Sequence, residues 1–194
     1  MPPFVTREAH TGHMAFLDRI RQRRRLAAED RRTARLAELH HIRGVIGGAE
    51  AVIRSGWTQK TLYARVDDRD RRHAVDPRHS PFDEACLVGA VVHAAGGPDA
   101  ARSQLAQRSL DLIWHTLYRG TDRPVGGCPA PGVRAARVVD LARWNDRRGR
   151  TRADVLALLS ATATVAEREE CRLRPHRSDS AGPPVLVSGT GSPT

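Results

Sequence analysis

The chain contains little lysine, few aromatic residues and few cysteines, and each shortage restricts what the protein can be. Lys60 is the single lysine among 32 basic residues, and aromatic residues make up 4% of the 194 positions. The core must therefore be built from Ala, Val, Leu and Ile. Cys86, Cys128 and Cys171 lie far apart in the sequence, which excludes a disulfide framework and a four-cysteine zinc site.

Long apolar segments are also missing. No window approaches the roughly 18 uninterrupted apolar residues of a membrane span, so we expect no contact with a membrane. The N-terminus lacks the apolar run of a signal peptide, and we therefore expect a cytoplasmic protein. Hydrophobic residues make up 40% of the chain and charged residues 28%, which is enough for one packed domain with tails.

The net charge of +10 is unevenly distributed. Residues 1–56 carry 11 basic and 6 acidic side chains, whereas residues 57–170 carry 18 and 15. Nearly all the basic residues are arginine, and Ala, Gly and Pro are abundant, as is typical of a GC-rich coding sequence. The total charge is therefore weak evidence for a nucleic-acid partner, and its position in the chain is more informative.

The residue pattern of the first long segment predicts a helix whose first half is basic and whose second half carries an apolar stripe. Residues 14–43 contain neither proline nor glycine, and 19–35 hold eight arginines against two acidic residues. An apolar stripe with helical spacing then follows; it consists of Leu36, Leu39, Ile42, Ile46, Ala49 and Ile53. Gly44, Gly47 and Gly48 interrupt it, which predicts either a break or a close helix contact.

Four further helices are expected, over residues 81–95, 98–119, 133–144 and 152–170. Ser80 with Asp83 and Thr151 with Asp154 have the spacing of capping boxes, and they predict the starts of two of these helices. The short helix 81–95 is almost wholly apolar, so it should be central and buried. Residues 61–75 predict a small irregular β-hairpin. The expected fold is all-α, with five helices around one core and one small hairpin.

This pattern also predicts the domain organisation. We expect a mobile terminus over residues 1–13 and a basic helical extension over 14–43. A compact helical domain should follow over 44–170. Residues 171–194 are rich in Pro, Gly and Ser and should form a disordered tail.

Three short motifs carry a resemblance to a known family. They are Gly56-Trp57-Thr58-Gln59, Cys86-Leu87-Val88-Gly89-Ala90, and Trp144-Asn145-Asp146 followed by Gly149-Arg150-Thr151. In this order the chain resembles, over roughly residues 46–168, a group of small uncharacterised bacterial proteins classed as a domain of unknown function. The resemblance implies a compact helical domain and no particular activity. The segments 14–43 and 119–132 depart from the family pattern.

The arginine-rich segment is the main candidate for a binding surface. A helix with a net charge of +6 over residues 19–35 suits the phosphate backbone of a nucleic acid. The residues expected to make the contact are Arg21, Arg23, Arg24, Arg25, Arg31, Arg32 and Arg35. No aromatic residue is interleaved for base stacking, and no helix-turn-helix or zinc-finger spacing is present. The alternative is a solvated helix whose arginines reflect codon usage.

Two other functions remain open on the sequence. Cys86 is a candidate nucleophile of a cysteine-dependent hydrolase or transferase, although a cysteine on an apolar helix is usually a small core residue. His93 lies seven residues further along the same expected helix, so the two backbones are about 10.5 Å apart and the side chains cannot pair directly. The third hypothesis is a structural subunit that docks on a partner protein through Phe16, Leu17 and Ile20.

The family motifs are interpreted mainly as architecture. If they form a binding pocket, the residues expected to line it are Trp57, Gln59, Tyr63, Trp144, Asn145 and Asp146. No metal site is expected, because the histidines show neither His-x-x-x-His nor HExxH spacing on an expected helix. The glycines form no phosphate-binding loop, and no cofactor is expected.

Overall fold

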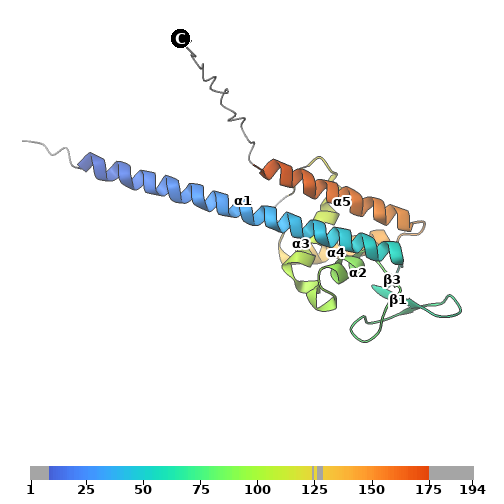
Figure 1. The fold of residues 1–194 in the computed structure, drawn as a ribbon. Helices are drawn as coiled ribbons and strands as arrows, with labels where there is room; N and C mark the ends of the chain where they lie inside the picture. Colours follow the sequence, from blue (N-terminus) through green and yellow to red (C-terminus); the bar gives the residue numbers. More distant parts are fainter. Residues whose placement is uncertain (1–8, 124, 126–128, 175–194) are drawn as a thin grey trace, which may run out of the picture.

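The structure is a computed structural model that describes residues 9–123, 125 and 129–174. It confirms a helical fold with a small sheet (Figure 1). The five α-helices are α1 (Ala9–Ser55), α2 (Leu87–Ala94), α3 (Gln104–Arg119), α4 (Pro131–Asn145) and α5 (Arg152–Leu173). A 3₁₀-helix, η1 (Pro98–Arg102), precedes α3, and the strands are β1 (Tyr63–Val66), β2 (Arg72–Ala74) and β3 (Glu84–Ala85).

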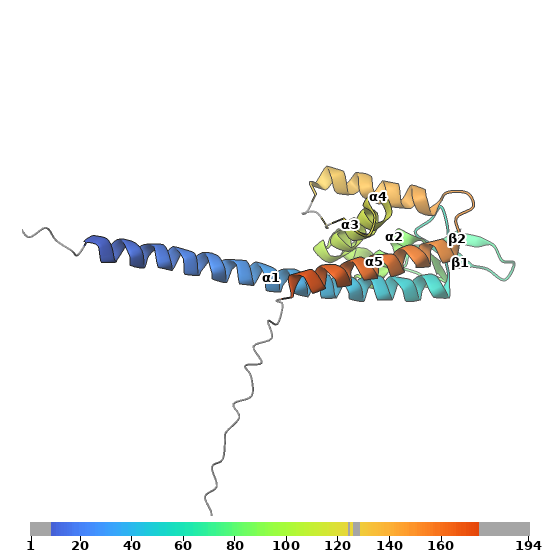
Figure 2. The same ribbon diagram turned by 90° about the horizontal axis from the view of Figure 1, so that it is seen from above.

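Helix α1 is the longest helix and extends well beyond the other elements (Figure 1). Its C-terminal half lies alongside α5, and its N-terminal half extends past the body into solvent (Figures 1 and 2). Leu39, Ile42, Ile46, Ala49 and Ile53 are buried, as the apolar stripe predicts. The helix begins at Ala9, so residues 9–13 are helical where a mobile terminus is predicted. The disordered tail is predicted from residue 171, but α5 continues to Leu173. Residues 1–8 and 175–194 lie outside the described residues.

The glycines of α1 make a close helix contact and do not break the helix. The helix is continuous through Gly44, Gly47 and Gly48. A Cβ placed on Gly48 would lie 3.0 Å from the Cβ of Ala94 at the end of α2, whereas Gly44 and Gly47 face open space. Of the two outcomes predicted for this segment, the structure therefore shows the contact.

The hairpin prediction is confirmed, and a third strand joins it. β1 pairs antiparallel with β2, with Ala64 opposite Ala74, and pairs antiparallel with β3 on its other edge. Asp67 organises the turn, because its carboxylate accepts hydrogen bonds from the backbone N–H groups of Arg69 and Arg71. The contact with the His73 side chain, followed by these backbone hydrogen bonds, holds the pKa of Asp67 far below its ordinary value.

The start predicted for the central helix is wrong. α2 begins at Leu87, and the sulfur of Cys86 caps it by accepting the N–H of Gly89 at 3.4 Å. Residues 84 and 85 form β3, and Asp83, the predicted capping residue, binds the backbone N–H of Val66 at 2.8 Å. The carboxylate of Asp83 and the residues after it therefore bind β1, although the local capping pattern predicts that they start a helix. The helix expected from Pro98 is likewise split into η1 and α3, and the hydroxyl of Ser103 caps α3.

The core is aliphatic, as the shortage of aromatic residues requires. Every residue from Leu87 to Val92 in α2 is buried, which confirms α2 as the central helix. Helices α1, α3 and α4 pack against it, and α5 packs against α1 and α3; these four helices add Ile46, Ile113, Leu141 and Leu159 to the same core. In the described part of the chain, none of the helices is both long and apolar enough for a membrane crossing.

Candidate functional site

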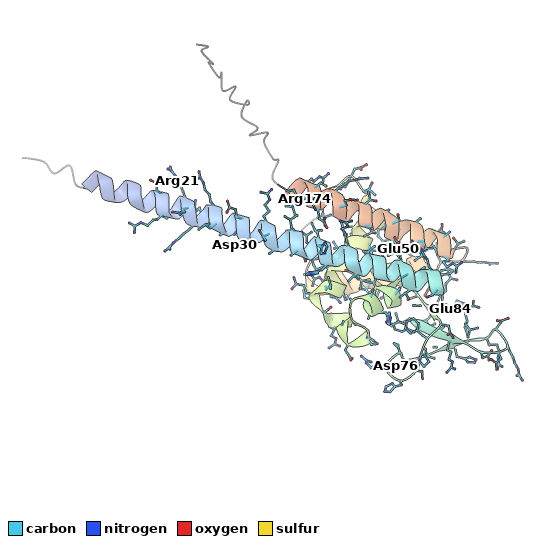
Figure 3. All side chains as sticks on the ribbon, in the orientation of Figure 1. Arg21, Asp30, Glu50, Asp76, Glu84 and Arg174 are labelled. Carbon is cyan, nitrogen blue, oxygen red and sulfur yellow. The ribbon has the colours of Figure 1, made fainter. Side chains whose placement is uncertain are left out.

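The projecting half of α1 carries the predicted basic surface. Arg21, Arg23, Arg24, Arg25 and Arg31 are all exposed, and Figure 3 shows Arg21 well beyond the body of the molecule. Within the described residues, Arg21 has an exposed ion pair with Asp18 at 3.4 Å, while the other four have no ion pair. An exposed pair of this kind contributes about 0–1 kcal/mol, so it leaves the charge of Arg21 available.

The arginines continue a helix face that is apolar inside the body. Steps of three, four or seven residues along an α-helix return to the same face. Such steps lead from buried Leu39 to Arg35, Arg31 and then Arg24. The face that packs against the core in one half of α1 is therefore charged in the other half. An arginine face cannot take part in a further apolar core, and it faces water or anions instead.

Arg32 and Arg35 have structural contacts where α1 leaves the body. The Nε of Arg32 donates to the carbonyl oxygen of Leu173 at the end of α5. Arg35 and Arg108 both bind the carboxylate of Glu38. Burial raises the pKa of Glu38, but the hydrogen bonds from the two arginines outweigh burial and leave the pKa below its ordinary value. Arg32 and Arg35 therefore hold the extension in place, in contrast to the five exposed arginines.

The family motifs meet at one buried side chain, Asn145 at the end of α4. Its Oδ1 accepts the indole N–H of Trp57 at 3.0 Å and the backbone N–H of Leu87 at 3.2 Å. Its Nδ2 donates to the carbonyl of Thr58 at 3.2 Å and to the carboxylate of Asp146 at 2.9 Å. The amide thus uses both of its polar atoms within the protein.

The remaining motif residues surround this centre. Gln59 donates to the carbonyl oxygen of Asn145 at 2.8 Å, and Asp146 accepts the backbone N–H of Lys60 at 2.8 Å. Trp144 lies under the guanidinium of Arg150, 3.9 Å from the ring centroid. The contacts of Gln59 and Asp146 join the end of α4 to the segment before β1, and the contact of Trp144 with Arg150 joins α4 to the connector that follows it.

The described structure places two of the six predicted pocket residues beside cavities, and these two cavities differ. Trp57 lies beside a cavity formed with Arg72, Glu84 and Arg152, while Tyr63 lines a different, more apolar one. A pocket made from all six stays a prediction. The hydrogen bonds around Asn145 favour the architectural interpretation.

Cys86 lies at the N-terminus of α2 with 5% of its surface exposed. Burial raises the pKa of its thiol above the ordinary value, although hydrogen bonds from the backbone N–H groups of Gly89 and Val88 act in the opposite direction. A raised pKa decreases the thiolate fraction at neutral pH. Catalysis by Cys86 stays a prediction that this geometry does not favour.

Other candidates can be placed only in part. The side chains of Phe16 and Leu17 lie outside the described ones, and Ile20 is partly exposed, so docking through this patch stays a prediction. Among residues 9–123, 125 and 129–174, no group of three or more His, Cys, Asp or Glu has the proximity needed to hold a metal ion.

Sequence reasoning missed a second basic region, at the point where α1, α3 and α4 meet. It contains Arg108, Arg119, Arg123 and Arg137 around Trp114. The signal available in the sequence was the spacing of Arg108, Asp111, His115 and Arg119, which places polar groups along one side of the expected helix 98–119. The contribution of α4 depends on helix packing, so the spacing within one helix could not have predicted it.

The comparisons with known proteins bear on the family. Residues 40–165 match the model of a family of unknown function, DUF6197. The chain belongs to this family. The comparisons with curated proteins and with solved structures gave no match. The DUF6197 match begins at residue 40, so the projecting, arginine-rich half of α1 precedes the matched region.

Proposed function

We propose that the protein binds the phosphate backbone of nucleic acid through the exposed arginines of α1, without reading the base sequence. The observation that carries this proposal is the change of the α1 core face into an arginine face where the helix leaves the body. The extension from residue 18 to residue 35 is about 26 Å long at 1.5 Å rise per residue. Its partner must therefore be extended and anionic, as a nucleic-acid backbone is.

The arrangement of the arginines around the helix supports the same partner. Consecutive residues project about 100° apart, so Arg23, Arg24 and Arg25 cover roughly half of the circumference. A helix that is basic on several sides suits a groove with phosphates on both flanks. Its diameter of about 10–12 Å is close to the width of the major groove of B-form DNA, about 12 Å.

The scarcity of base-reading side chains other than arginine sets the expected specificity. Between residues 18 and 35, Gln22 is the one side-chain amide, and there is no aromatic residue. Arginine can also bind guanine, but here its contacts are expected to go to phosphates. Affinity should therefore depend strongly on salt and weakly on sequence.

The test compares two variants with the same change in charge. The first replaces the exposed arginines of α1 by glutamine, at Arg21, Arg23, Arg24, Arg25 and Arg31. The control replaces five exposed arginines of the body that have no ion pair within the described residues, at Arg65, Arg69, Arg102, Arg143 and Arg148. Both variants retain Arg32 and Arg35, which hold the extension to the body.

Fluorescence anisotropy with duplex DNA and with single-stranded RNA, over a range of salt concentrations, gives the result. We expect the α1 variant to lose most of its affinity at low salt and the control to keep it. For duplex DNA, the slope of log affinity against log salt should fall by about 0.9 for each phosphate that the variant no longer neutralises. If circular dichroism shows that both variants are folded and their affinities are equal, the proposal is contradicted.

A further inference from the structure

A cavity of about 430 Å³ lies where α1 leaves the body, between α1, α3, α4 and the loop after α3. Leu39, Ile42 and Leu112 provide its apolar part. The arginines that line it are Arg35, Arg108, Arg119, Arg123 and Arg137, and Asp111 is the single lining carboxylate. The cavity therefore combines an apolar surface with a ring of cationic side chains.

The carboxylates around the cavity do not balance these cations. Glu38 binds both Arg35 and Arg108, and Asp111 binds both Arg134 and Arg137. Asp140 accepts the indole N–H of Trp114 at 3.1 Å. The region thus contains six arginines and three carboxylates, a net charge of +3.

Two of the arginines are especially available for a ligand. Arg119 and Arg123 have no carboxylate partner among residues 9–123, 125 and 129–174. The guanidinium of Arg119 lies 5.9 Å from the centroid of the Trp114 ring. Cations without counter-charge around a partly enclosed space favour an anion from solvent.

Arg137 adds an independent indication. Its guanidinium packs on the face of Trp114, 4.2 Å from the ring centroid, so its position is fixed. Its Nε is buried and has no hydrogen-bond acceptor in the described chain. Buried N–H donors in folded proteins nearly always have an acceptor, so the described chain leaves this guanidinium, which also lines the cavity, incompletely hydrogen-bonded.

We propose that this cavity binds a phosphate monoester. Guanidinium groups pair with phosphate oxygens through two parallel hydrogen bonds, and several arginines suit the double negative charge of a monoester. The cavity is larger than a phosphate group, and its apolar surface accommodates the organic part of the ligand. The monoester can belong to a free nucleotide or to the 5′ end of a nucleic-acid strand. The inference does not rest on the proposed function, since it uses a different set of arginines.

The first experiment uses the full-length protein and isothermal titration calorimetry at constant ionic strength, with inorganic phosphate, adenosine 5′-monophosphate and adenosine as probes. We expect the monophosphate to bind, phosphate to bind more weakly, and adenosine not to bind. In the double variant Arg119→Gln/Arg123→Gln, affinity for the monophosphate should fall at least 10-fold, the equivalent of about 1.4 kcal/mol. Neither arginine has an ion pair in the described structure, so the variant should remain folded.

The matched control is Arg102→Gln/Arg143→Gln, which makes the same charge change at exposed sites on η1 and α4 and should bind as the wild type does. The proposal is overturned if the monophosphate does not bind, or if the two double variants bind it equally. A weak, equal response to phosphate in all three proteins would mean an adventitious ion only.

A second arm distinguishes the two sources of the monoester. It compares two single-stranded oligonucleotides that differ only in a 5′-phosphate or a 5′-hydroxyl. Preference for the phosphorylated strand, abolished in Arg119→Gln/Arg123→Gln, assigns the site to strand ends, and monophosphate binding without this preference assigns it to free nucleotides. The α1 variant should retain monophosphate binding, so failure of the backbone proposal and failure of this one give different results.

Discussion

Trp57 donates its indole N–H to Asn145 at 3.0 Å, across 88 positions of the sequence. The same amide oxygen accepts the first N–H of α2, and the amide nitrogen binds the carbonyl of Thr58. One side chain with 0% exposure therefore joins the end of α4, the start of α2 and the segment before β1. These are the three places at which the motifs of the sequence occur, and the hydrogen bonds favour an architectural interpretation of the motifs.

The first prediction concerns this amide. Asn145→Ala leaves two donors and one acceptor without partners in the interior, and each such group costs about 1–3 kcal/mol. We therefore expect the free energy of unfolding to fall by roughly 3–5 kcal/mol, measured by urea denaturation. Gln59→Ala is the control, because Gln59 binds the backbone of Asn145 from a partly exposed position and should cost about 1 kcal/mol. If Asn145→Ala unfolded at the wild-type midpoint, the architectural interpretation would fail.

Two capping patterns show how much of the fold the sequence could predict. At Thr151 the expected capping box is present, with reciprocal hydrogen bonds between Thr151 and Asp154, and α5 begins where predicted. Ser80 and Asp83 have the same spacing, but Asp83 binds the backbone of Val66 and the following residues form β3. Local signals decide a helix start only where no distant strand competes for the same backbone groups.

The candidate sites divide in the same way. Exposure of the α1 arginines follows from composition and spacing within one helix, and it could be predicted. The cavity around Trp114 needs Arg108 from α3 and Arg137 from α4, and only packing brings them together. The contact between Gly48 and Ala94 also depends on packing. The glycines of α1 predict either a break or a close helix contact, and the position of α2 decides between the two.

The second prediction uses two glycines in opposite environments. A Cβ on Gly89 would lie 2.3 Å from the carbonyl oxygen of Leu62, which belongs to the backbone and cannot move aside. Gly89→Ala should therefore destabilise the protein by about 2–3 kcal/mol or more. Gly44 lies inside α1 with nothing within 4 Å, so Gly44→Ala should stabilise it by about 0.5–1 kcal/mol. Urea midpoints check both, and equal effects would contradict the close packing of Leu62, just before β1, against α2.

The third prediction concerns Cys86. Its burial and raised pKa should make the thiol unreactive in the folded protein. In the double variant Cys128→Ser/Cys171→Ser, we expect a thiol reagent to label Cys86 only after urea unfolds the chain. The exposed Cys171, left as the single thiol in Cys86→Ser/Cys128→Ser, is the control and should react in the folded state. Rapid labelling of Cys86 without denaturant would revive the cysteine-enzyme hypothesis.

The fourth prediction is an alkaline loss of stability caused by Tyr63. Burial, together with the nearby Cys86, raises the pKa of its phenol from 10.0 to about 12, and the hydroxyl donates to the carbonyl of Gly89 at 2.9 Å. Below pH 10 the phenol is neutral in both states. Between pH 10 and 12 the unfolded chain loses this proton and the folded chain retains it, so stability falls as the pH rises, by up to about 2.7 kcal/mol.

Urea denaturation across this range should show the loss in the wild type and a flatter profile in Tyr63→Phe. The pKa of Cys86 is also raised, so this thiol lowers the stability of both proteins as the pH rises. The difference between the two stability profiles therefore reports on Tyr63. Ultraviolet absorbance gives a direct check in Tyr118→Phe, where Tyr63 is the single tyrosine and should ionise near pH 12. Parallel stability profiles, or ionisation of Tyr63 near pH 10, would mean that this ring is not buried against α2.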